Sequence, residues 1–547
     1  MKTKGGVPLV RGDASYETFH QAFRWEVPAQ FNFGIDVVDR MARDHDGPAL
    51  IAQNASGQVR RFTFSDIASL TDRLANGLRA RGVNKGDFVI VMLPRIPEWQ
   101  IAVVAALKLG AVPIPCIEML TEKDLAYRIS NSGARAVICR AEQTGKFAAM
   151  ADALDIRVSV GATKGWDEFD EVIAGAPAQF EPPAVAAEDP AIMYYTSGST
   201  GNPKGVLHSS RALYSWWVSA AYWLDLEPGD LIWCTADTGW SKAGTSILFG
   251  PWARGACSLF YDGPFDPAER LRMLERHRVN VYCAPATELA RVAEEAGAGF
   301  DLSALRRTVS AGEAVSATIN RKWIEAVGMP VCEAYGQTEA LMLVLNYPGE
   351  PVKPGSMGRP SPGSTIAIVD EEGRELPPGE EGDIALLTPN PQLMLGYWKE
   401  PERTETCFRD GPAGRWYITG DRGVKDSEGY LWYAGRMDDI INSAGYRIGP
   451  SEVEDVLLAH PAVQECAVVG KPDPARGEIV MAFIQPRDMK EADASLVRAL
   501  QDYCKAQTAP YKYPREIVFV DSLPKTLTGK VKRSELRERA ANEARLA

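Results

Sequence analysis

The chain has 547 residues, of which 45% are hydrophobic and 24% are charged. This length exceeds what one hydrophobic core usually serves, so we expect at least two domains. The 60 Lys and Arg residues against 72 Asp and Glu residues give a net charge of -12. That balance argues against general binding to nucleic acids or to anionic membranes.

The nine cysteines are scattered and odd in number. They predict reduced, mostly buried thiols rather than a disulfide framework or a zinc site. The first twenty residues lack the apolar stretch of a signal peptide. The longest apolar region, 101–117, contains Lys108 and two prolines and is too short for a spanning helix. We therefore expect a cytoplasmic protein with no membrane insertion.

Strand and helix patterns alternate over the first 190 residues. A strand is expected at 60–64, followed by a helix that Ser65 caps and Gly82 ends, and then by a strand at 87–93 and a helix at 97–110. Further strands and helices continue in the same alternation. The pattern predicts an α/β fold with a parallel sheet covered by helices on both faces.

The sequence pattern changes after about residue 350. Short β-type runs at 363–370 and 381–388, rich in Gly and Pro nearby, predict a small barrel or distorted sheet. After Arg436 the order of patterns becomes helix, strand, strand, helix, strand, and Ser451 with Glu454 is interpreted as the capping box of the first helix. We expect a compact α+β unit here.

The main domain boundary is predicted at Met437/Asp438. It divides the chain into an N-terminal domain, 1–437, and a C-terminal domain, 438–547. The last 43 residues carry ten Lys or Arg against five Asp or Glu. This surplus could meet an anionic ligand, or it could be a solvated basic helix.

A candidate phosphate loop reads TSGSTGNPKG from Thr196 to Gly205. Glycines allow a tight turn in which backbone N–H groups converge on an anion, and the hydroxyl side chains and Lys204 add donors and positive charge. A Walker A loop is disfavoured because Pro203 precedes the lysine and Gly205 follows it. Taken by itself, the segment could also be an ordinary surface turn.

Four further motifs follow in the chain: EAYGQTE at 333–339, YITGD at 417–421, GRMDDIINSAGYRIGPSEVE at 435–454 and LPKTLTGK at 523–530. With the candidate phosphate loop, they resemble the adenylate-forming superfamily of acyl-CoA synthetases, luciferases and peptide-synthetase adenylation domains. Three more segments look most like its medium-chain acyl-CoA synthetase family: LPRIPEW at 93–99, DTGW at 237–240 and TAPYKYPR at 508–515. The resemblance runs from about residue 30 to residue 538.

The resemblance implies a large N-terminal domain of two doubly wound αβα subdomains plus a small β-barrel-like subdomain, and a small mobile α+β C-terminal domain. It implies an AMP-forming acid:CoA ligase that activates a carboxylic acid as an acyl-adenylate and then transfers the acyl group to CoA. ATP, Mg²⁺ and CoA are the implied cofactor and substrates. Both half reactions spread negative charge over oxygens, which calls for preorganised cations.

The same resemblance assigns the nucleotide site. The implied catalytic residues are Lys204, Thr338, Glu339 and Lys530, with Glu339 as the contact to Mg²⁺. The implied ATP and AMP contacts are Thr196, Ser197, Gly198, Ser199, Thr200, Gly201, Gly312, Glu313, Ala314, Tyr335, Gly336, Asp421, Arg436 and Arg447. Within this set Tyr335 would stack on adenine, and Gly312, Glu313 and Ala314 would line the same pocket. Asp421 would accept from both ribose hydroxyls, and Arg436 would reach the ribose or a phosphate.

Other implied residues serve the acyl group, CoA and a domain rotation. The acyl pocket is assigned to Trp240, Lys242 and Gly336, where glycine replaces the tryptophan that shortens the pocket of acetyl-CoA synthetases. Such a pocket favours a medium-chain, branched or aromatic acid. Asp438 is the implied hinge. CoA contacts are assigned to Ser443, Ala444, Gly445, Tyr446, Arg476 and Lys512.

Two other functions remain compatible with these residues. One is an acyl-adenylate synthetase that loads a separate carrier protein, and the other is a catalytically silent nucleotide or acyl sensor. A luciferase-type monooxygenase is a further member of the same superfamily. The five histidines show no ligand spacing, so a metalloenzyme or a Ser-His-Asp hydrolase is poorly supported. The sequence indicates no oligomeric state.

Overall fold

The structure is a computed structural model that describes residues 16–196, 202–296, 299–436, 439, 441–443, 446–473, 476–508, 512–526 and 531–546. These residues form two compact units, one within 1–365 and 389–406 and the other within 366–388 and 407–547. The small β region after residue 365 thus belongs to the same unit as the C-terminal residues. Met437 and Asp438 lie outside the described residues, so the predicted boundary between them stays a prediction.

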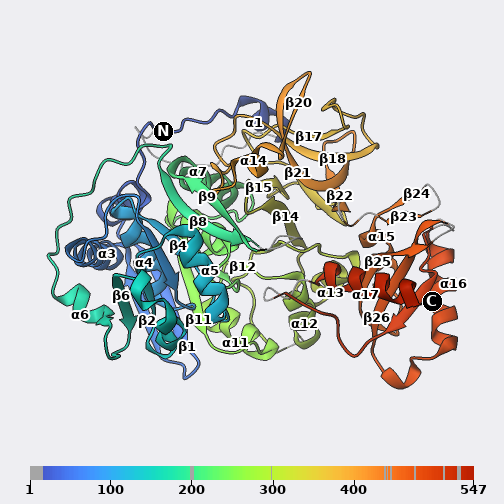
Figure 1. Cartoon of the computed structure of the whole chain (residues 1–547), viewed down its shortest axis with the longest axis horizontal. Helices are drawn as coiled ribbons and strands as arrows, with labels where there is room; N and C mark the ends of the chain where they lie inside the picture. Colours follow the sequence, from blue (N-terminus) through green and yellow to red (C-terminus); the bar gives the residue numbers. More distant parts are fainter. Residues whose placement is uncertain are drawn as a thin grey trace. The chain divides into compact units, whose positions relative to one another are not determined.

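The N-terminal part of the first unit is built on a parallel sheet, as predicted. Its strand order is β4 (Val112–Pro115), β3 (Phe88–Met92), β5 (Ala136–Arg140), β6 (Ile156–Val160) and β7 (Asp167–Glu168). The accompanying helices are α3 (Phe64–Ala80), α4 (Pro97–Lys108), α5 (Glu122–Ser132), η2 (Ala141–Ala153) and α6 (Phe169–Ala174). α3 packs against α4 (Figure 1). α5 packs against η2.

Helices cover both faces of this sheet. The side chains of β3 point alternately into the two cores that lie between the sheet and these helices. Val89 and Val91 belong to the core that contains α3 and α4, whereas Ile90 and Met92 belong to the core that contains α5. Successive side chains of a strand point to opposite faces, so this division confirms the predicted three-layer arrangement.

The predicted cap of α3 is wrong by two residues. Thr63, not Ser65, is the N-cap: its Oγ1 accepts from the Asp66 N–H at 3.2 Å, and the Asp66 carboxylate accepts from the Thr63 N–H at 2.8 Å. This reciprocal pair satisfies two donors that the first turn leaves without a partner. Ser65 lies within the first turn instead.

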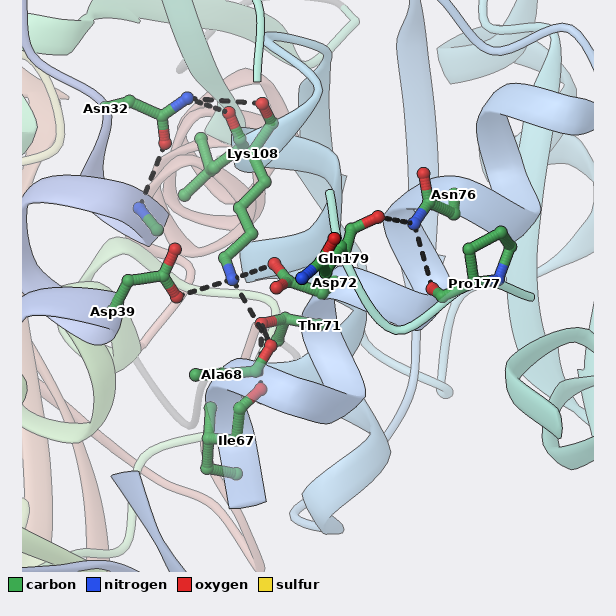
Figure 2. A network of polar contacts seen from close by, with 12 residues as sticks. Asn32, Asp39, Ile67, Ala68, Thr71, Asp72, Asn76, Lys108, Pro177 and Gln179 are labelled. Carbon is green, nitrogen blue, oxygen red and sulfur yellow. Dashed lines mark hydrogen bonds and ion pairs between the residues drawn. The ribbon is translucent and has the colours of Figure 1, made fainter. Parts of the chain in front are cut away.

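A buried charge cluster joins three segments beside the same sheet (Figure 2). Lys108 ends α4 with no exposed side-chain surface, and its Nζ contacts Asp39 at 2.6 Å and Asp72 at 2.5 Å. It also donates to the Ala68 carbonyl at 3.3 Å. A Cβ at Gly34 would lie 2.4 Å from Lys108 Cγ, so glycine is needed for the lysine stem to pass. Lys108 is therefore an internal ion-pair partner.

The larger sheet of the first unit runs in the order β16 (Ser356–Pro360), β15 (Leu341–Leu345), β14 (Val331–Gln337), β13 (Arg307–Ala311), β12 (Val281–Cys283), β10 (Leu231–Cys234), β11 (Cys257–Asp262), β1 (Pro48–Asn54) and β2 (Val59–Thr63). Pairing is parallel from β14 to β1 and antiparallel at both ends. A third, antiparallel sheet contains β19 (Gly396–Tyr397), β9 (Lys204–Ser209) and β8 (Pro190–Thr196).

The first unit contains further helices, most of them short. They are α1 (Tyr16–Ala22), η1 (Gly34–Asp39), α2 (Arg40–Asp44), α7 (Ser210–Ser215), α8 (Trp217–Tyr222), α9 (Ser241–Ala243), η3 (Gly244–Leu248), α10 (Phe249–Ala253), α11 (Pro267–His277), α12 (Ala286–Glu295), α13 (Ala317–Val327) and α14 (Pro401–Glu405). α12 packs against α13 beside the larger sheet.

The second unit contains the predicted small β region. Its strands are β17 (Ile366–Val369), β18 (Glu381–Leu387), β20 (Phe408–Gly411), β21 (Gly414–Lys425) and β22 (Leu431–Arg436), all in antiparallel pairs. The two β-type runs expected from the sequence are β17 and β18. Their prediction as paired strands is confirmed.

The C-terminal part of the second unit has the predicted α+β order. It contains β23 (Ile441–Ser443), β24 (Tyr446–Ile448), α15 (Pro450–Leu458), β25 (Val463–Asp473), β26 (Gly477–Pro486), η4 (Met489–Glu491), α16 (Ala494–Gln507), β27 (Glu516–Phe519) and α17 (Arg533–Leu546). The predicted capping box is wrong, because Gly449 is the N-cap of α15 and its N–H donates to Glu452 at 3.2 Å.

Two composition-based expectations can be compared with the structure. The nine cysteines carry free thiols, and all except Cys407 are buried. Among the described residues, no helix has both the length and the apolar character that a membrane span requires.

Candidate active site

The candidate phosphate loop connects two paired strands. β8 ends at Thr196 and β9 begins at Lys204, and these two residues are opposite each other in the antiparallel register. The apolar run before the loop is buried in β8. Ser197, Gly198, Ser199, Thr200 and Gly201 lie outside the described residues. The two ends of the loop are therefore held together by backbone pairing.

Thr196 is the last residue of β8 and begins the candidate phosphate loop. Its Oγ1 is buried, and no hydrogen bond to it is made by the part of the chain that the structure describes. A buried hydroxyl without a partner costs free energy unless a ligand or water bonds to it. Such an atom at the start of the loop suits a group that donates to a phosphate oxygen.

Tyr397 lies between two predicted catalytic residues. β19 pairs with β9, with Tyr397 opposite Val206. The Lys204 Nζ lies 4.6 Å from the centroid of the Tyr397 ring, and the Tyr397 hydroxyl donates to Glu339 Oε1 at 2.9 Å. A cation over a ring and a phenol on a carboxylate are both favourable contacts. The structure thus brings Lys204 and Glu339 to one side chain.

Thr338 is fixed by two further contacts. His208 Nε2 lies 2.6 Å from the Thr338 carbonyl oxygen, and Ser241 Oγ lies 3.2 Å from Thr338 Oγ1. Because a carbonyl oxygen only accepts, His208 donates from Nε2–H. Burial lowers the pKa of His208 to about 4, which makes the ring neutral near pH 7. The backbone of Glu339 is held as well, since its carbonyl accepts from the Met394 N–H at 2.8 Å.

The predicted adenine residues occupy the carboxyl ends of two adjacent parallel strands. In the pairing of β13 with β14, Ala311 lies opposite Ala334. Gly312 and Tyr335 are the next residues of the two segments. Gly312 has φ +92°, a left-handed conformation that favours glycine. Ligands commonly bind at this end of a parallel sheet. The Glu313 carboxylate has a structural use, because it accepts from the Thr287 N–H at 2.9 Å.

Two of the adenine residues are accessible. Gly312 and Ala314 are exposed, whereas Tyr335 is half-buried on β14. An accessible turn next to a partly covered ring is compatible with a planar ligand between them. The nucleotide roles of these residues stay predictions.

Gly336 is required by the backbone itself. A Cβ at this position would lie 1.9 Å from the Leu341 carbonyl oxygen, which is closer than any real side chain allows. The register shifts between Tyr335 and Gly336, and Leu341 has φ +56°. The sequence interpretation treated the missing side chain as space for the acyl group, but in this structure the Leu341 carbonyl fills that direction. A role of Gly336 in the acyl pocket stays a prediction.

The predicted acyl-pocket segment lies beside Thr338. Trp240 directly precedes Ser241, and its partly buried ring packs against the core that contains Cys116 and Ile117. Lys242 is also partly buried, and its Nζ donates to the Ala311 carbonyl at 3.0 Å. Lys242 therefore touches the end of β13, next to the predicted adenine residues. Its interpretation as a pocket wall stays a prediction.

In the second unit, two predicted ribose residues are brought together. Asp421 on β21 and Arg436 on β22 are opposite each other, and their Oδ1 and Nη1 atoms are 3.9 Å apart. The Asp421 side chain is 8% exposed, whereas that of Arg436 is 50% exposed. Gly420, with φ +76°, turns the chain just before the aspartate. A buried acceptor beside an exposed cation suits a sugar next to a phosphate.

The predicted CoA segment forms a hairpin whose strands are β23 and β24. Ser443 pairs with Tyr446, and Asn442 pairs with Arg447. Ser443 also pairs with Gly477, directly after Arg476, so two predicted CoA residues are neighbours. Lys512, the other cation of the predicted CoA set, forms an ion pair with Glu452. This partner makes Lys512 a weaker candidate for CoA phosphates than Arg476, which is exposed.

Several predicted residues cannot be placed. Lys530, Asp438, Ala444 and Gly445 lie outside the described residues, as do the side chains of Tyr446 and Arg447. Their roles stay predictions.

Comparison with known proteins agrees with the motifs. The family model "AMP-binding enzyme" matches residues 37–398, and "AMP-binding enzyme C-terminal domain" matches residues 452–530. The mitochondrial acyl-coenzyme A synthetase ACSM3 of Homo sapiens is 38% identical over 545 residues, covering 96% of this chain and 92% of the relative. The uncharacterized acyl–CoA ligase YtcI of Bacillus subtilis is 41% identical over 517 residues, covering 94% of this chain and 96% of the relative.

A solved structure extends this similarity to the fold. The anthranilate CoA ligase AuaEII, in complex with anthranoyl-AMP, has a TM-score of 0.86 and 30% identity and covers 95% of this chain and 99% of its own. The chain belongs to the adenylate-forming acyl-CoA synthetase family. The predicted fold class and the prediction of an AMP-forming acid:CoA ligase are confirmed at the level of this family.

Sequence reasoning missed His208, Tyr397 and Ser241 as neighbours of the site. A signal existed for His208, because residues four apart on a strand share a face and Lys204 begins the same strand. Tyr397 becomes visible only through the pairing of β19 with β9, two segments almost 200 residues apart in the chain.

Proposed function

We propose that the chain activates a medium-chain, branched or aromatic carboxylic acid with ATP and transfers the acyl group to CoA. The observation that carries the residue assignments is the placement of Lys204 and Glu339 on Tyr397, at the end of the hairpin with the candidate phosphate loop. An ammonium and a carboxylate beside the same tyrosine are the groups that a metal-bound triphosphate needs.

In the first half reaction, the acid carboxylate attacks the α-phosphorus of ATP and pyrophosphate leaves. Lys204 and the loop donors would hold the phosphates, and Asp421 would orient the ribose. Glu339 fits a site for Mg²⁺, because a single carboxylate suffices where phosphate oxygens supply other ligands, and the ion would neutralise phosphate charge. Preorganised charges of this kind supply most of the catalysis in phosphoryl chemistry.

In the proposed division of labour, Lys530 serves only the adenylation step. Replacing Lys530 with alanine should lower pyrophosphate exchange by about 100-fold or more, the typical cost of deleting a charge-stabilising group. Thioester formation from supplied acyl-adenylate should survive. Equal loss in both half reactions would refute the assignment.

The C-terminal domain is proposed to rotate about Asp438 between the half reactions. Hinges absorb φ/ψ change at few residues, often at the ends of elements. Asp438→Pro should therefore impair one half reaction more than the other. The segment around Ser443, with Arg476, would then present the thiol path and hold CoA phosphates.

The acid class is tested with a panel of substrates. Rates of AMP and thioester formation would be compared from acetate to dodecanoate, with benzoate and branched acids included. Each buried methylene contributes about 0.8 kcal/mol, so the rates should rise with chain length toward an optimum. A maximum at acetate would contradict the proposed pocket.

Carrier-protein loading is the alternative within the same chemistry. Supplying CoA or a purified acyl carrier protein as acceptor separates the two. A silent sensor would bind ATP without releasing pyrophosphate, whereas a monooxygenase would consume oxygen. We further propose a cytoplasmic location, on the expectation drawn from the sequence.

A further inference from the structure

β9 presents two polar side chains to one face. Lys204 begins the strand and His208 follows four residues later, and residues at even spacing in a strand share a face. His208 is fully buried. Its Nε2 lies 2.6 Å from the Thr338 carbonyl, and its Nδ1 is buried with no hydrogen-bond partner in the described part of the chain.

The geometry excludes an acid or base role for this imidazole. The Nε2 proton is committed to the Thr338 carbonyl, and the Nδ1 lone pair does not reach solvent. A purely apolar packing role is also poorly served by histidine, because burial of an unpartnered ring nitrogen is costly. What the ring provides is one donor at a fixed point of the β14–β15 loop.

The residue after Thr338 is anchored to the same strand by a second route. The Glu339 carboxylate accepts from the Tyr397 hydroxyl at 2.9 Å, and Tyr397 pairs with Val206, which lies between Lys204 and His208 on β9. The loop is therefore attached to β9 through a backbone carbonyl on one side and through a carboxylate on the other.

We propose that His208 is a positioning residue for Glu339: its Nε2–H holds the Thr338 carbonyl, so the strand that carries Lys204 also places the Glu339 carboxylate. This inference rests on the proposed role of Glu339 in adenylation. His208 would touch no substrate and would act only through the backbone of Thr338. β9 would then set the distance between the Lys204 ammonium and the Glu339 carboxylate at the phosphates.

The test compares the full-length wild type with two variants of His208. One variant keeps a hydrogen-bond donor near the position of Nε2, and the other removes it. Gln in His208→Gln can place an amide N–H near the position of Nε2, whereas His208→Leu removes the donor and keeps the bulk. Pyrophosphate exchange should fall about tenfold or more in kcat for H208L, with a smaller change in the KM for ATP. H208Q should stay within about threefold of the wild type, and thioester formation from supplied acyl-adenylate should be unchanged in both.

Matched controls separate this effect from general damage. His277 is a partly buried histidine in the same unit, with Nε2 2.8 Å from Gln53 Oε1, and H277L should leave exchange unchanged. If H208L does not fold, His208→Asn takes its place, because its amide is one methylene too short to reach the carbonyl. Loss in H208N with retention in H208Q would support the inference.

Two outcomes distinguish failure of this inference from failure of the proposed function. If Glu339→Gln keeps adenylation, the proposed role of Glu339 fails and the inference fails with it. If E339Q is inactive while H208L, or H208N in its place, matches the wild type, the inference alone is overturned. In the H208L/E339Q double variant, the two losses should not add, because both act on one carboxylate; full additivity would contradict positioning through Glu339.

Discussion

Two charged clusters of the first unit use lysine and carboxylates in opposite ways. Lys108 is fully buried and meets Asp39 and Asp72 directly (Figure 2). Lys204 instead faces the ring of Tyr397, whose hydroxyl donates to Glu339. In the first cluster two carboxylates contact the ammonium directly. In the second, the Tyr397 ring contacts the cation and its hydroxyl contacts the carboxylate. This difference distinguishes charges that stabilise the fold from charges that suit a ligand.

The electrostatics of the Lys108 cluster fit a structural role. Burial raises the pKa of Asp39 above its ordinary value, although Lys108 opposes this shift. Two carboxylates share one ammonium, so removing the lysine would leave uncompensated charge in a region with little water. Burying charge is tolerable only when partners and hydrogen bonds remain in place.

Breaking the first cluster should give the largest effect. Lys108→Met should lower the free energy of unfolding by about 3–5 kcal/mol, because Asp39 and Asp72 lose their partner. Urea denaturation of the full chain measures this change. Adding Asp72→Asn to K108M should recover part of the loss, and the acid:CoA ligase activity of the folded fraction should stay unchanged. A stability equal to that of the wild type would contradict the structural role.

Neutralising the second cluster should affect catalysis and spare stability. Glu339→Gln keeps the size and the acceptor for Tyr397 but removes the charge. We expect kcat/KM for adenylation to fall about 100-fold or more, equivalent to roughly 2.7 kcal/mol of transition-state stabilisation. Thermal unfolding should change little. A fall in stability comparable to that of K108M would erase the distinction between the clusters.

A smaller effect is expected from removing the link between the two charges. Tyr397→Phe keeps the ring under Lys204 and deletes the hydroxyl that Glu339 accepts from. We expect a five- to tenfold loss in adenylation, about 1–1.4 kcal/mol, the usual worth of one hydrogen bond to a charged group or slightly less. Tyr397→Leu, which also removes the ring, provides the comparison and should lose more. Equal activity of Y397F and the wild type would show that the hydroxyl is dispensable.

The smallest effect concerns the protonation of His277, which belongs to neither cluster. Burial, with Arg276 and Arg61 nearby, lowers the pKa of His277 to about 4. The unfolded state therefore binds a proton first as the pH falls below about 6.5, and stability is lost between about pH 6.5 and 4. Since the ring is partly exposed, we expect only about 1 kcal/mol between pH 7 and 5. Thermal unfolding of His277→Gln across this range should show a shallower pH slope than the wild type, and an identical slope would contradict the shift.

Much of the fold was predictable because it depends on local patterns. The alternation of strand and helix patterns indicated the parallel sheet, and α4, β17 and β18 appear where the sequence placed them. Helix starts were less predictable, because several polar residues compete for one cap. Thr63 rather than Ser65, and Gly449 rather than Ser451, precede the first helical residue. The winner depends on the backbone conformation of the preceding turn.

The site divides in the same way. The motifs located Lys204, Glu339 and Asp421, since their residue types follow from the chemistry of phosphate and ribose. Tyr397 could not be placed, because only tertiary pairing brings its segment beside β9. For His208 the spacing from Lys204 was readable, but its partner, the Thr338 carbonyl, comes from a distant segment. For the same reason, Lys108 seemed only to interrupt an apolar run, although Asp39 and Asp72 turn it into a core residue.

Rapid-quench analysis of one turnover without CoA tests the central claim most directly. With ATP and octanoate, the enzyme should form one equivalent of acyl-adenylate and of pyrophosphate per active chain. Later addition of CoA should convert the adenylate to AMP and octanoyl-CoA. Formation of ADP or of inorganic phosphate, or a thioester that appears with no adenylate before it, would contradict the account.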